Sequence, residues 1–522
     1  MKHMNRILAL ALALIMVLGL AVTGSATKIT VDDKAVEDAE YAAYKLLNAT
    51  DLGDGKFSYT VNEKYRTALQ SVIGEGKTDE EIIAAIDAMD ADAVRAFADS
   101  VYLLIKGMAA DYTATDNVFE DVAPGYYMIV ETQTGSADGF DEDTYSLVLL
   151  DTAGKDDITV ETKEELPESQ KKVKDANDST GAITDWQDSA DHDIGDEVPF
   201  QIIFTLPGDF AKYKEYFVGI HDIQAAGLTY KENSLSVTVN GQTFTDAFTY
   251  SAVEAGACEK GCTFHIQCAD IIAAAKAKGI TLSAGDDIVF EYISTLNEQA
   301  VLGSTGNPNE MTVEFSNNPY GDGTSETPKD RVIVFTYKVN VDKYKETVSD
   351  GNELTGAGFT LYKEVPANTE NAQTGAAIKA GFTENIKATA LADDKYYIVI
   401  SATETDAEGD TFGFKGVDDG NYVLVETLVP AGYNAWEAVA FTISAEHDVE
   451  SADPKLTSLT GGDLFTGEVS TGVLDADIIN NSGIELPKTG GIGTTIFYVV
   501  GGMLAVAAVI LLVTKKRMAS AE

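Results

Sequence analysis

Three strand-like segments near the C-terminus each carry one polar side chain on an apolar face. Alternate residues of a strand share a face, so VFTYKVNVDK places Lys343 in line with Val339 and Val341. The same alternation turns Glu426 of NYVLVET and Asn480 of VLDADIINN inward. A buried amine is costly unless it is paired or neutral. The pattern leaves three interpretations open: side chains that reach water at strand ends, an ordinary buried ion pair, or a neutral, reactive cluster.

The middle of the chain repeats this pattern. In QKKVKD, Lys171 shares a face with Val173. In MTVEFSNN, Asn317 follows Met311, Val313 and Phe315 on one face. A second inward lysine and a second inward asparagine are therefore predicted.

The N-terminus has the composition of a secretory signal. Lys2 and Arg6 precede an apolar stretch, and the small residues Gly24, Ser25 and Ala26 follow it. This order predicts cleavage after Ala26 and an exported mature protein. A permanent N-terminal membrane anchor is the alternative, and the small residues at the exit disfavour it.

The C-terminus combines three signals in a fixed order. Leu486-Pro487-Lys488-Thr489-Gly490 is followed by an apolar run at 496–513 and by the basic residues 515–517. The run is long enough for a membrane helix of about 17–25 residues, and the basic residues predict a cytoplasmic end. The whole resembles the LPXTG sorting signal of Gram-positive wall proteins. By that resemblance a sortase attacks the Thr489 carbonyl, releases the chain from Gly490 onward, and passes the acyl group to an amine.

Composition sets the class of protein. The chain has 522 residues, 45% of them hydrophobic, which suits about three folded domains. The formal net charge of −47 argues against nucleic-acid binding, which needs a basic surface. Five histidines without a dense metal-ligand motif, and no nucleophile elbow, argue against an enzyme. No cofactor is expected.

Three cysteines, Cys258, Cys262 and Cys268, lie close together. One disulfide is expected in an oxidising compartment, with one thiol left over and the pairing open. Strand alternation in CTFHIQC puts Cys262 and Cys268 on one face and His265 on the other. We therefore predict no zinc site and no other metal site.

Further segments resemble the subunits of sortase-assembled pili. ELTGAGFTLYKEV, YVLVETLVPAGY and INNSGIELPKTGG resemble the collagen-adhesin B-type module that ends many pilins. The resemblance implies a covalent isopeptide bond between Lys343 and Asn480, assisted by Glu426 as proton shuttle. KKVKD, DWQDSADHDIGDEVPFQI and FSNNP resemble the second domain of backbone pilins. There it implies a Lys171–Asn317 bond assisted by Asp222.

The resemblance also implies a lysine that accepts the next subunit. In DDITVETKEELP, Val160 and Lys163 match the pilin motif, whereas its Tyr-Pro and Asn positions differ. Lys163 is our prediction, Lys155 and the cluster 171–174 are the alternatives, and an ordinary solvated lysine is the other interpretation. Glu131 of GYYMIVET matches the same glutamate pattern as Glu426, but no inward lysine and asparagine accompany it, and no bond is predicted there.

The predicted fold is mainly β, with three tandem Ig-like, collagen-adhesin-type sandwiches. The expected divisions are a signal peptide at 1–26, a first domain with added helices at 27–165, a middle domain at 166–328, a B-type domain at 329–485, and the sorting tail at 486–522.

The implied function is that of a major pilin, polymerised head to tail by a pilus-type sortase and joined to peptidoglycan by a wall-anchoring sortase. It would be displayed on the cell surface for adhesion and would turn over no substrate. Minor pilins and a receptor on a host or bacterial surface are further implied partners. The alternative is a monomeric wall-anchored adhesin with the same domains, in which Lys163 has no linking role.

Overall fold

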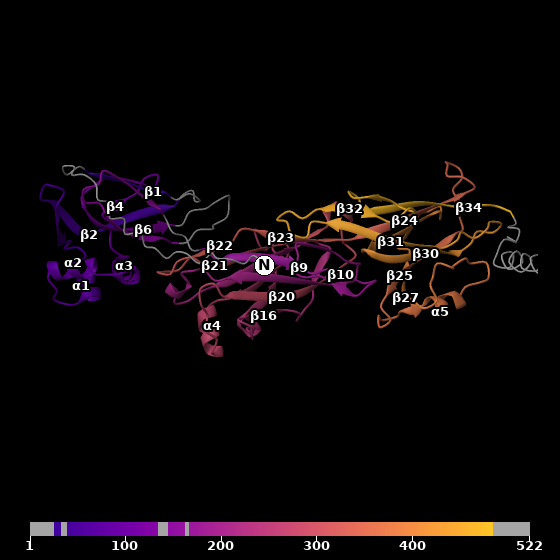
Figure 1. The fold of residues 1–522 in the computed structure, drawn as a ribbon, viewed down its shortest axis with the longest axis horizontal. Helices are drawn as coiled ribbons and strands as arrows, with labels where there is room; N and C mark the ends of the chain where they lie inside the picture. Colours follow the sequence, from indigo (N-terminus) through magenta and orange to yellow (C-terminus); the bar gives the residue numbers. More distant parts are fainter. Residues whose placement is uncertain (1–25, 33–38, 134–144, 162–165, 484–522) are drawn as a thin grey trace, which may run out of the picture.

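The computed structural model describes residues 26–32, 39–133, 145–161 and 166–483. It is mainly β, as predicted. Figure 1 shows three β-rich parts in a row along the long axis, with the first part at one end and the third at the other. Within the described ranges, no helix combines the length and apolar character that a membrane crossing requires. The predicted apolar run at 496–513 lies outside those ranges.

The first part packs a small sheet and three helices on a larger sheet. The small sheet has the order β5-β1-β8, and the larger one has β3-β2-β6-β7 with β4 beside β2. The strands are β1 Thr27–Asp32, β2 Glu40–Asp51, β3 Phe57–Val61, β4 Tyr112–Thr113, β5 Val118–Val122, β6 Gly125–Gln133, β7 Leu147–Asp151 and β8 Asp157–Glu161. Successive residues of β2 enter two cores, Tyr44 the core beneath the helices and Ala43 the core between the sheets.

Two of the three helices of this part begin at a capping side chain. The three helices are α1 Arg66–Ile73, α2 Asp79–Asp87 and α3 Ala91–Ile105. Thr78 caps α2 in a capping box with Glu81, and Asp90 caps α3. Such caps satisfy backbone N–H groups that the first helical turn leaves free.

The middle part is a two-sheet sandwich. One sheet has the order β17-β16-β20-β13-β9 with β15 beside β20, and the other has β12-β23-β21-β14-β19-β18 with β22 beside β21. The strands are β9 Glu168–Val173, β12 Ser189–Asp191, β13 Glu197–Thr205, β14 Val218–Gln224, β15 Leu228–Tyr230, β16 Ser236–Val239, β17 Gln242–Thr243, β18 Thr249–Ala252, β19 Phe264–Cys268, β20 Asp287–Leu296, β21 Asn307–Ser316, β22 Thr324–Glu326 and β23 Asp330–Phe335. Because β23 pairs with β21, this sandwich extends to Phe335, beyond the expected boundary at 328.

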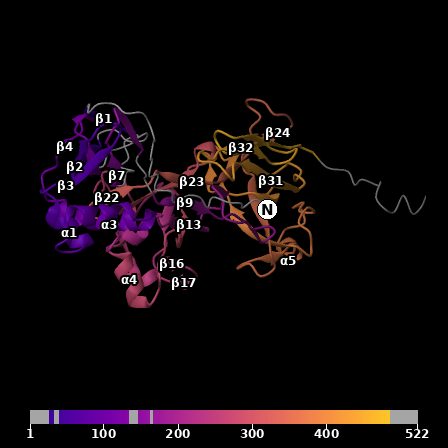
Figure 2. The same cartoon turned by 60° about the vertical axis from the view of Figure 1, so that its left-hand side comes forward.

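One helix and one hairpin project from this sandwich. The helix α4, Ile271–Lys278, is capped by Asp270. The hairpin consists of β10 Ala176–Asn177 and β11 Ala182–Ile183. In both views α4 lies at the lower edge of the middle part, near β16 (Figures 1 and 2).

The third part is a second sandwich, and its first and last strands are neighbours. Its sheets have the orders β28-β29-β24-β34-β33 and β26-β27-β25-β30-β31-β32. The elements are β24 Tyr337–Lys345, β25 Gly358–Val365, β26 Gln373–Thr374, α5 Gly375–Ala380, β27 Tyr396–Ser401, β28 Glu404–Thr405, β29 Thr411–Val417, β30 Gly420–Leu428, β31 Val439–His447, β32 Leu456–Thr460, β33 Thr466–Glu468 and β34 Val473–Asn480. β24 and β34 pair in parallel over eight residues, from Lys338↔Val473 to Lys345↔Asn480.

A buried charge cluster joins the second and third parts. Lys363 of β25 has a fully buried side chain. Its Nζ lies 2.8 Å from Asp178 and 2.6 Å from Asp193, both of the middle part, and 2.6 Å from Asp418 beside β30. The hairpin reinforces the joint, since Asn177 donates a hydrogen bond to Asp419 at 2.9 Å. One amine thus connects carboxylates from both sandwiches.

Replacing Lys363 by Met should destabilise this joint strongly. The substitution leaves three carboxylates clustered without their cation, and breaking a buried pair in this way costs about 3–5 kcal/mol of unfolding free energy. Lys395→Met is the matched control, because Lys395 pairs with Glu364 and is half exposed; its expected cost is below about 1 kcal/mol. Urea denaturation at neutral pH measures both, and equal effects would contradict the role of the cluster.

Candidate functional site

The third part buries a lysine, a glutamate and an asparagine at one point. Lys343 lies on β24 and Asn480 on the neighbouring β34, whereas Glu426 comes from β30 in the facing sheet. Their exposed fractions are 1%, 1% and 0%. The structure therefore brings together the three side chains that strand alternation turned inward, and none of them reaches water at a strand end.

The three groups form a closed triangle. Lys343 Nζ donates to Asn480 Oδ1 at 2.7 Å, and Asn480 Nδ2 donates to Glu426 Oε1 at 2.6 Å. The same Glu426 oxygen lies 3.2 Å from Lys343 Nζ. The backbone N–H of Trp436 holds the other oxygen of Glu426 at 2.7 Å. One carboxylate oxygen therefore faces both the amine and the amide nitrogen.

The surroundings shift the Lys343 amine toward its neutral form. Burial lowers the pKa of Lys343 to about 8, against an opposing effect of Glu426. The ring of Phe359 lies 5.1 Å from Nζ. A neutral amine carries a free electron pair, so Lys343 is prepared to act as a nucleophile toward the carboxamide that it contacts.

A second buried cluster lies in the middle sandwich. Lys171 Nζ of β9 lies 2.5 Å from Asp222 Oδ2 of β14. Tyr292 of β20 accepts a hydrogen bond from Lys171 Nζ at 2.8 Å and donates one to Asp222 Oδ2 at 2.7 Å. Tyr292 also accepts from Asn309 Nδ2 of β21 at 2.9 Å. The cluster thus contains an amine, a carboxyl and a carboxamide around one hydroxyl.

The asparagine in this cluster is Asn309, and the prediction of Asn317 is corrected. Asp222 pairs with Met311, so Asn317 lies six residues farther along the chain, about 20 Å at the usual rise per strand residue. There the side-chain Nδ2 of Asn317 donates to the hydroxyl of Ser325 at 2.6 Å, and the backbone carbonyl of Asn317 accepts from the backbone N–H of Tyr145. Alternation places both asparagines on one face, and only the register of β21 against β14 distinguishes them.

Burial shifts both ionisable groups of this cluster toward their neutral forms. It lowers the pKa of Lys171, although Asp222 opposes the shift, and it raises the pKa of Asp222 against the opposing effect of Lys171. Within the described residues, Asp222 Oδ1 and Asn309 Oδ1 are buried without a hydrogen-bond partner. Tyr292, which sequence reasoning missed, could have been found from DIVFEYISTL, where alternation turns it inward.

The remaining lysine predictions fall in different places. Lys163 and the pentapeptide 486–490 lie outside the described residues. Lys155 donates to the carbonyl of Asp151 at 2.9 Å. In the cluster 171–174, Lys171 is buried, Lys172 pairs with Asp188, and Lys174 lies over the ring of Trp186. Burial therefore removes Lys171 from the alternatives for a linking lysine.

Glu131 occupies the buried position that its sequence pattern suggests. It is 1% exposed, and its Oε2 accepts from the backbone N–H of Ser146 at 3.1 Å. No bond was predicted in this part of the chain.

The structure pairs Cys258 with Cys262 in a disulfide and leaves Cys268 as a buried thiol. It also places His221 and His265 beside that pair. The argument against a metal site does not hold, because β19 begins only at Phe264. Cys262 thus precedes the strand, and alternation does not fix its side relative to His265.

Two family matches agree with this architecture. Residues 338–455 match the family described as SpaA, a prealbumin-like fold domain, and residues 478–520 match the LPXTG cell wall anchor motif. The third part contains a SpaA-type domain. The anchor motif indicates a cell wall-anchored surface protein.

The chain is also similar over almost its whole length to a curated protein. It is 24% identical to the trypsin-resistant surface T6 protein of Streptococcus pyogenes serotype M6, covering 97% of this chain and 99% of that protein. Among solved structures, the T6 backbone pilin of that serotype covers 89% of this chain and 100% of its own, with 17% identity and a TM-score of 0.48. The match to the major pilin SpaD of Corynebacterium diphtheriae covers 88% of this chain and 98% of the SpaD chain, with 16% identity and a TM-score of 0.45. The family matches and the full-length relative confirm the resemblance to Gram-positive major pilins.

The lowered pKa of Lys343 should appear in the pH dependence of stability. In the variant Asn480→Ala, the Lys343 amine still has the carboxylate of Glu426 beside it but has lost the carboxamide of residue 480. Between the folded pKa of about 8 and the unfolded value of about 10.4, the unfolded chain binds more protons, so stability should rise with pH. Urea midpoints across this range measure the rise. The double variant Asn480→Ala/Lys343→Met should lack this rise of stability with pH. Equal pH dependence of the urea midpoints in the two variants would contradict the lowered pKa of Lys343.

Proposed function

We propose that this protein is the backbone subunit of a wall-anchored pilus, polymerised by a sortase and used for adhesion. The observation that carries the proposal is the triangle of Lys343, Asn480 and Glu426. It lies between the first and last strands of the domain that precedes the sorting motif. A covalent bond at this point suits a subunit that must transmit tension along a fibre.

The triangle supports one autocatalytic reaction. The neutral Lys343 amine attacks the Asn480 carboxamide carbon, and Glu426 takes a proton from the amine. Glu426 then gives a proton to the amide nitrogen, which leaves as ammonia. One carbon–nitrogen bond forms and one breaks, so no other reactant is needed. Holding the groups within hydrogen-bond distance supplies the proximity that such a step requires.

The middle cluster supports a second bond of the same kind. Lys171 would be the nucleophile, Asn309 the carboxamide and Asp222 the proton shuttle. Tyr292 positions all three through one hydroxyl. This bond would join the two sheets of the sandwich, since Lys171 and Asn309 lie in facing sheets.

The two bonds would chiefly increase the resistance of the subunit to pulling force. Lys343 and Asn480 are 137 residues apart, and closing so long a loop is worth about 5 kcal/mol by analogy with disulfides. Under tension, however, force entering β24 would pass directly to β34 through a covalent bond. The hydrogen bonds between these strands would then be protected from load.

Assembly would join the C-terminal sorting motif of one subunit to a lysine near the boundary between the first and middle domains of the next. A pilus-type sortase would cleave after Thr489 and join its carbonyl to Lys163 of the next subunit, and a wall-anchoring sortase would join the last one to peptidoglycan. The apolar run at 496–513 would retain the precursor at the membrane until cleavage. In this role the chain is a substrate of enzymes and turns over no substrate itself.

The isopeptide bonds should be visible in the intact mass. The purified ectodomain, with its disulfide reduced, should be lighter than the mass of its own sequence by two ammonia molecules, one per bond. Glu426→Ala and Asp222→Ala should each restore one, because each removes a proton shuttle. Full sequence mass in a folded sample would exclude both bonds.

A matched pair of variants tests the corrected asparagine. Asn309→Ala should restore one ammonia, whereas Asn317→Ala, on the same strand face, should leave the mass deficit unchanged. The opposite result would return the bond to Asn317.

Covalent polymers should survive boiling in detergent. Immunoblots of wall extracts should show a ladder of high-mass bands for the wild type and only monomer for Lys163→Ala, because the accepting amine is lost. Lys155→Ala is the matched control and should keep the ladder. A ladder that survives in Lys163→Ala would move the link to another lysine. Monomer alone in the wild type, with an active sortase present, would favour the single-subunit adhesin.

A further inference from the structure

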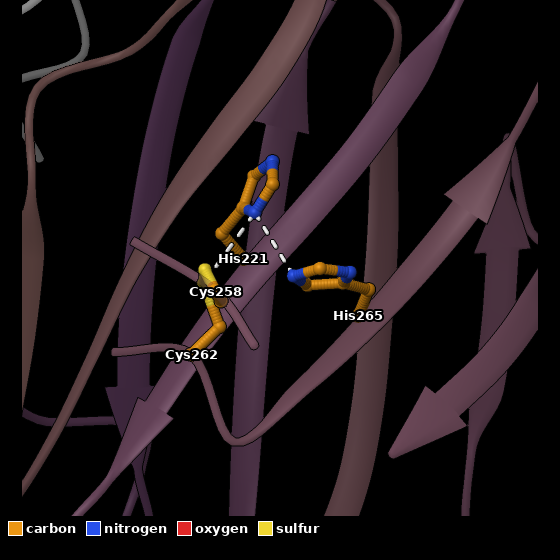
Figure 3. Close-up of side chains that lie close together, drawn as sticks. All are labelled: His221, Cys258, Cys262 and His265. Carbon is orange, nitrogen blue, oxygen red and sulfur yellow. Dashed lines mark hydrogen bonds between the residues drawn. A yellow bond between two sulfur atoms is a disulfide. The ribbon is translucent and has the colours of Figure 1, made fainter. Parts of the chain in front are cut away.

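Two histidines and two cysteines converge on the outer face of the middle sandwich. His221 of β14 and His265 of β19 are directly opposite each other in the strand register. Cys258 and Cys262 belong to the loop that leads into β19. Figure 3 shows the two imidazole rings turned toward each other, with the sulfur atoms beside them. Each residue offers one ligand atom, and these four atoms lie within 4.8 Å of one another.

The separations suit ligands of one tetrahedral ion. His221 Nδ1 lies 3.2 Å from His265 Nε2 and 3.5 Å from Cys262 Sγ. Zinc binds histidine nitrogen at about 2.0–2.1 Å and cysteine sulfur at about 2.3 Å, so its tetrahedral ligands lie about 3.3–3.8 Å apart. The two distances from His221 Nδ1 fall close to this range, whereas the two sulfur atoms are bonded to each other and must separate before both can bind one ion.

A carboxylate orients one of the histidines toward this point. His221 Nε2 lies 3.1 Å from Glu314 Oε2 on β21. A proton on Nε2 would satisfy that carboxylate and leave the lone pair of Nδ1 directed at His265 and Cys262. Histidines that bind metals characteristically donate their other N–H to a carboxylate in this way.

One contact ties the cysteine loop to the sheet beside the histidines, and a second closes the turn of the loop itself. Lys260, between the two cysteines, forms an ion pair with Glu326 of β22. The N–H of Gly261 bonds to the carbonyl of Cys258 at 3.0 Å. Gly261 has a φ of +79°, a conformation that a side chain disfavours. This turn brings Cys262 back beside Cys258.

We propose that the reduced form of this loop, with His221 and His265, binds a divalent zinc ion in a Cys2His2 site. Two thiolates and two imidazoles are a donor set that zinc favours in closed structural sites. The ion would tie the loop at 258–262 to β14 and β19. This site is independent of pilus assembly.

The site and the disulfide are alternative states of the same sulfur atoms. A dithiol reductant would transfer two electrons and two protons to the Cys258–Cys262 bond, leaving two thiols and becoming a disulfide itself. Zinc would then bind with release of both thiol protons. A newly made chain holds its thiols reduced in the cytosol, so it could take up the ion without that reductant.

Cobalt titration of the full chain tests the proposal. The protein is reduced with a phosphine under nitrogen and titrated with Co²⁺, whose tetrahedral thiolate complexes absorb visible light. We expect one equivalent to bind, and Zn²⁺ to bleach the colour by displacing it. The same wild-type chain with its disulfide re-formed should stay colourless. No colour in the reduced chain would overturn the proposal without recourse to any variant.

Variants then assign the ligands. Cys258→Ser and His221→Gln should each weaken cobalt binding at least about tenfold, whereas Cys268→Ala, which removes the thiol on the opposite face of β19, should leave it unchanged. Glu314→Gln should keep the tetrahedral spectrum and lower the affinity by about tenfold, as expected for a positioning residue. Unchanged binding in the double variant His221→Gln/His265→Gln would show that the thiols alone bind the ion and would overturn the site.

Discussion

The third domain depends on one constraint: the buried Lys343 amine must lie beside both Asn480 and Glu426. An isolated charged amine in this position would be strongly destabilising, so the fold must bring two particular partners to it. One comes from the neighbouring last strand and the other from the facing sheet. Both sheets and the parallel pairing of β24 with β34 are therefore needed to complete one triangle.

The middle domain reaches a related arrangement by a different route. There the lysine lies across the sandwich from its carboxyl and carboxamide partners, and the Tyr292 hydroxyl contacts all three. The joint between the domains uses a third buried lysine, Lys363, with three carboxylates and no carboxamide near enough to hydrogen-bond with it among the described contacts. Similar buried amines thus lie either in a cluster with a carboxyl and a carboxamide or among carboxylates alone, depending on the groups around them.

Local patterns predicted the faces of the strands well and the long-range register between strands poorly. Alternation correctly turned Lys343, Glu426 and Asn480 inward. Alternation could not choose between Asn309 and Asn317, because both lie on the same face along β21. Only the pairing of β21 with β14 determines which of them lies beside Asp222. The histidine–cysteine cluster was missed for a similar reason: His221 arrives from a strand more than 30 residues before Cys258.

The pairing of the first and last strands of this domain also affects how it would respond to proteolytic cleavage and to sequence variation in its loops. With Lys343 joined to Asn480, a single backbone cut anywhere between them would leave the two ends of the domain covalently connected. A protease that nicked an exposed turn of this segment would damage the fold locally but would not sever the fibre. With that bond in place, the loops between β25 and β33 could change the surface that they show to proteases without breaking the covalent continuity of the chain.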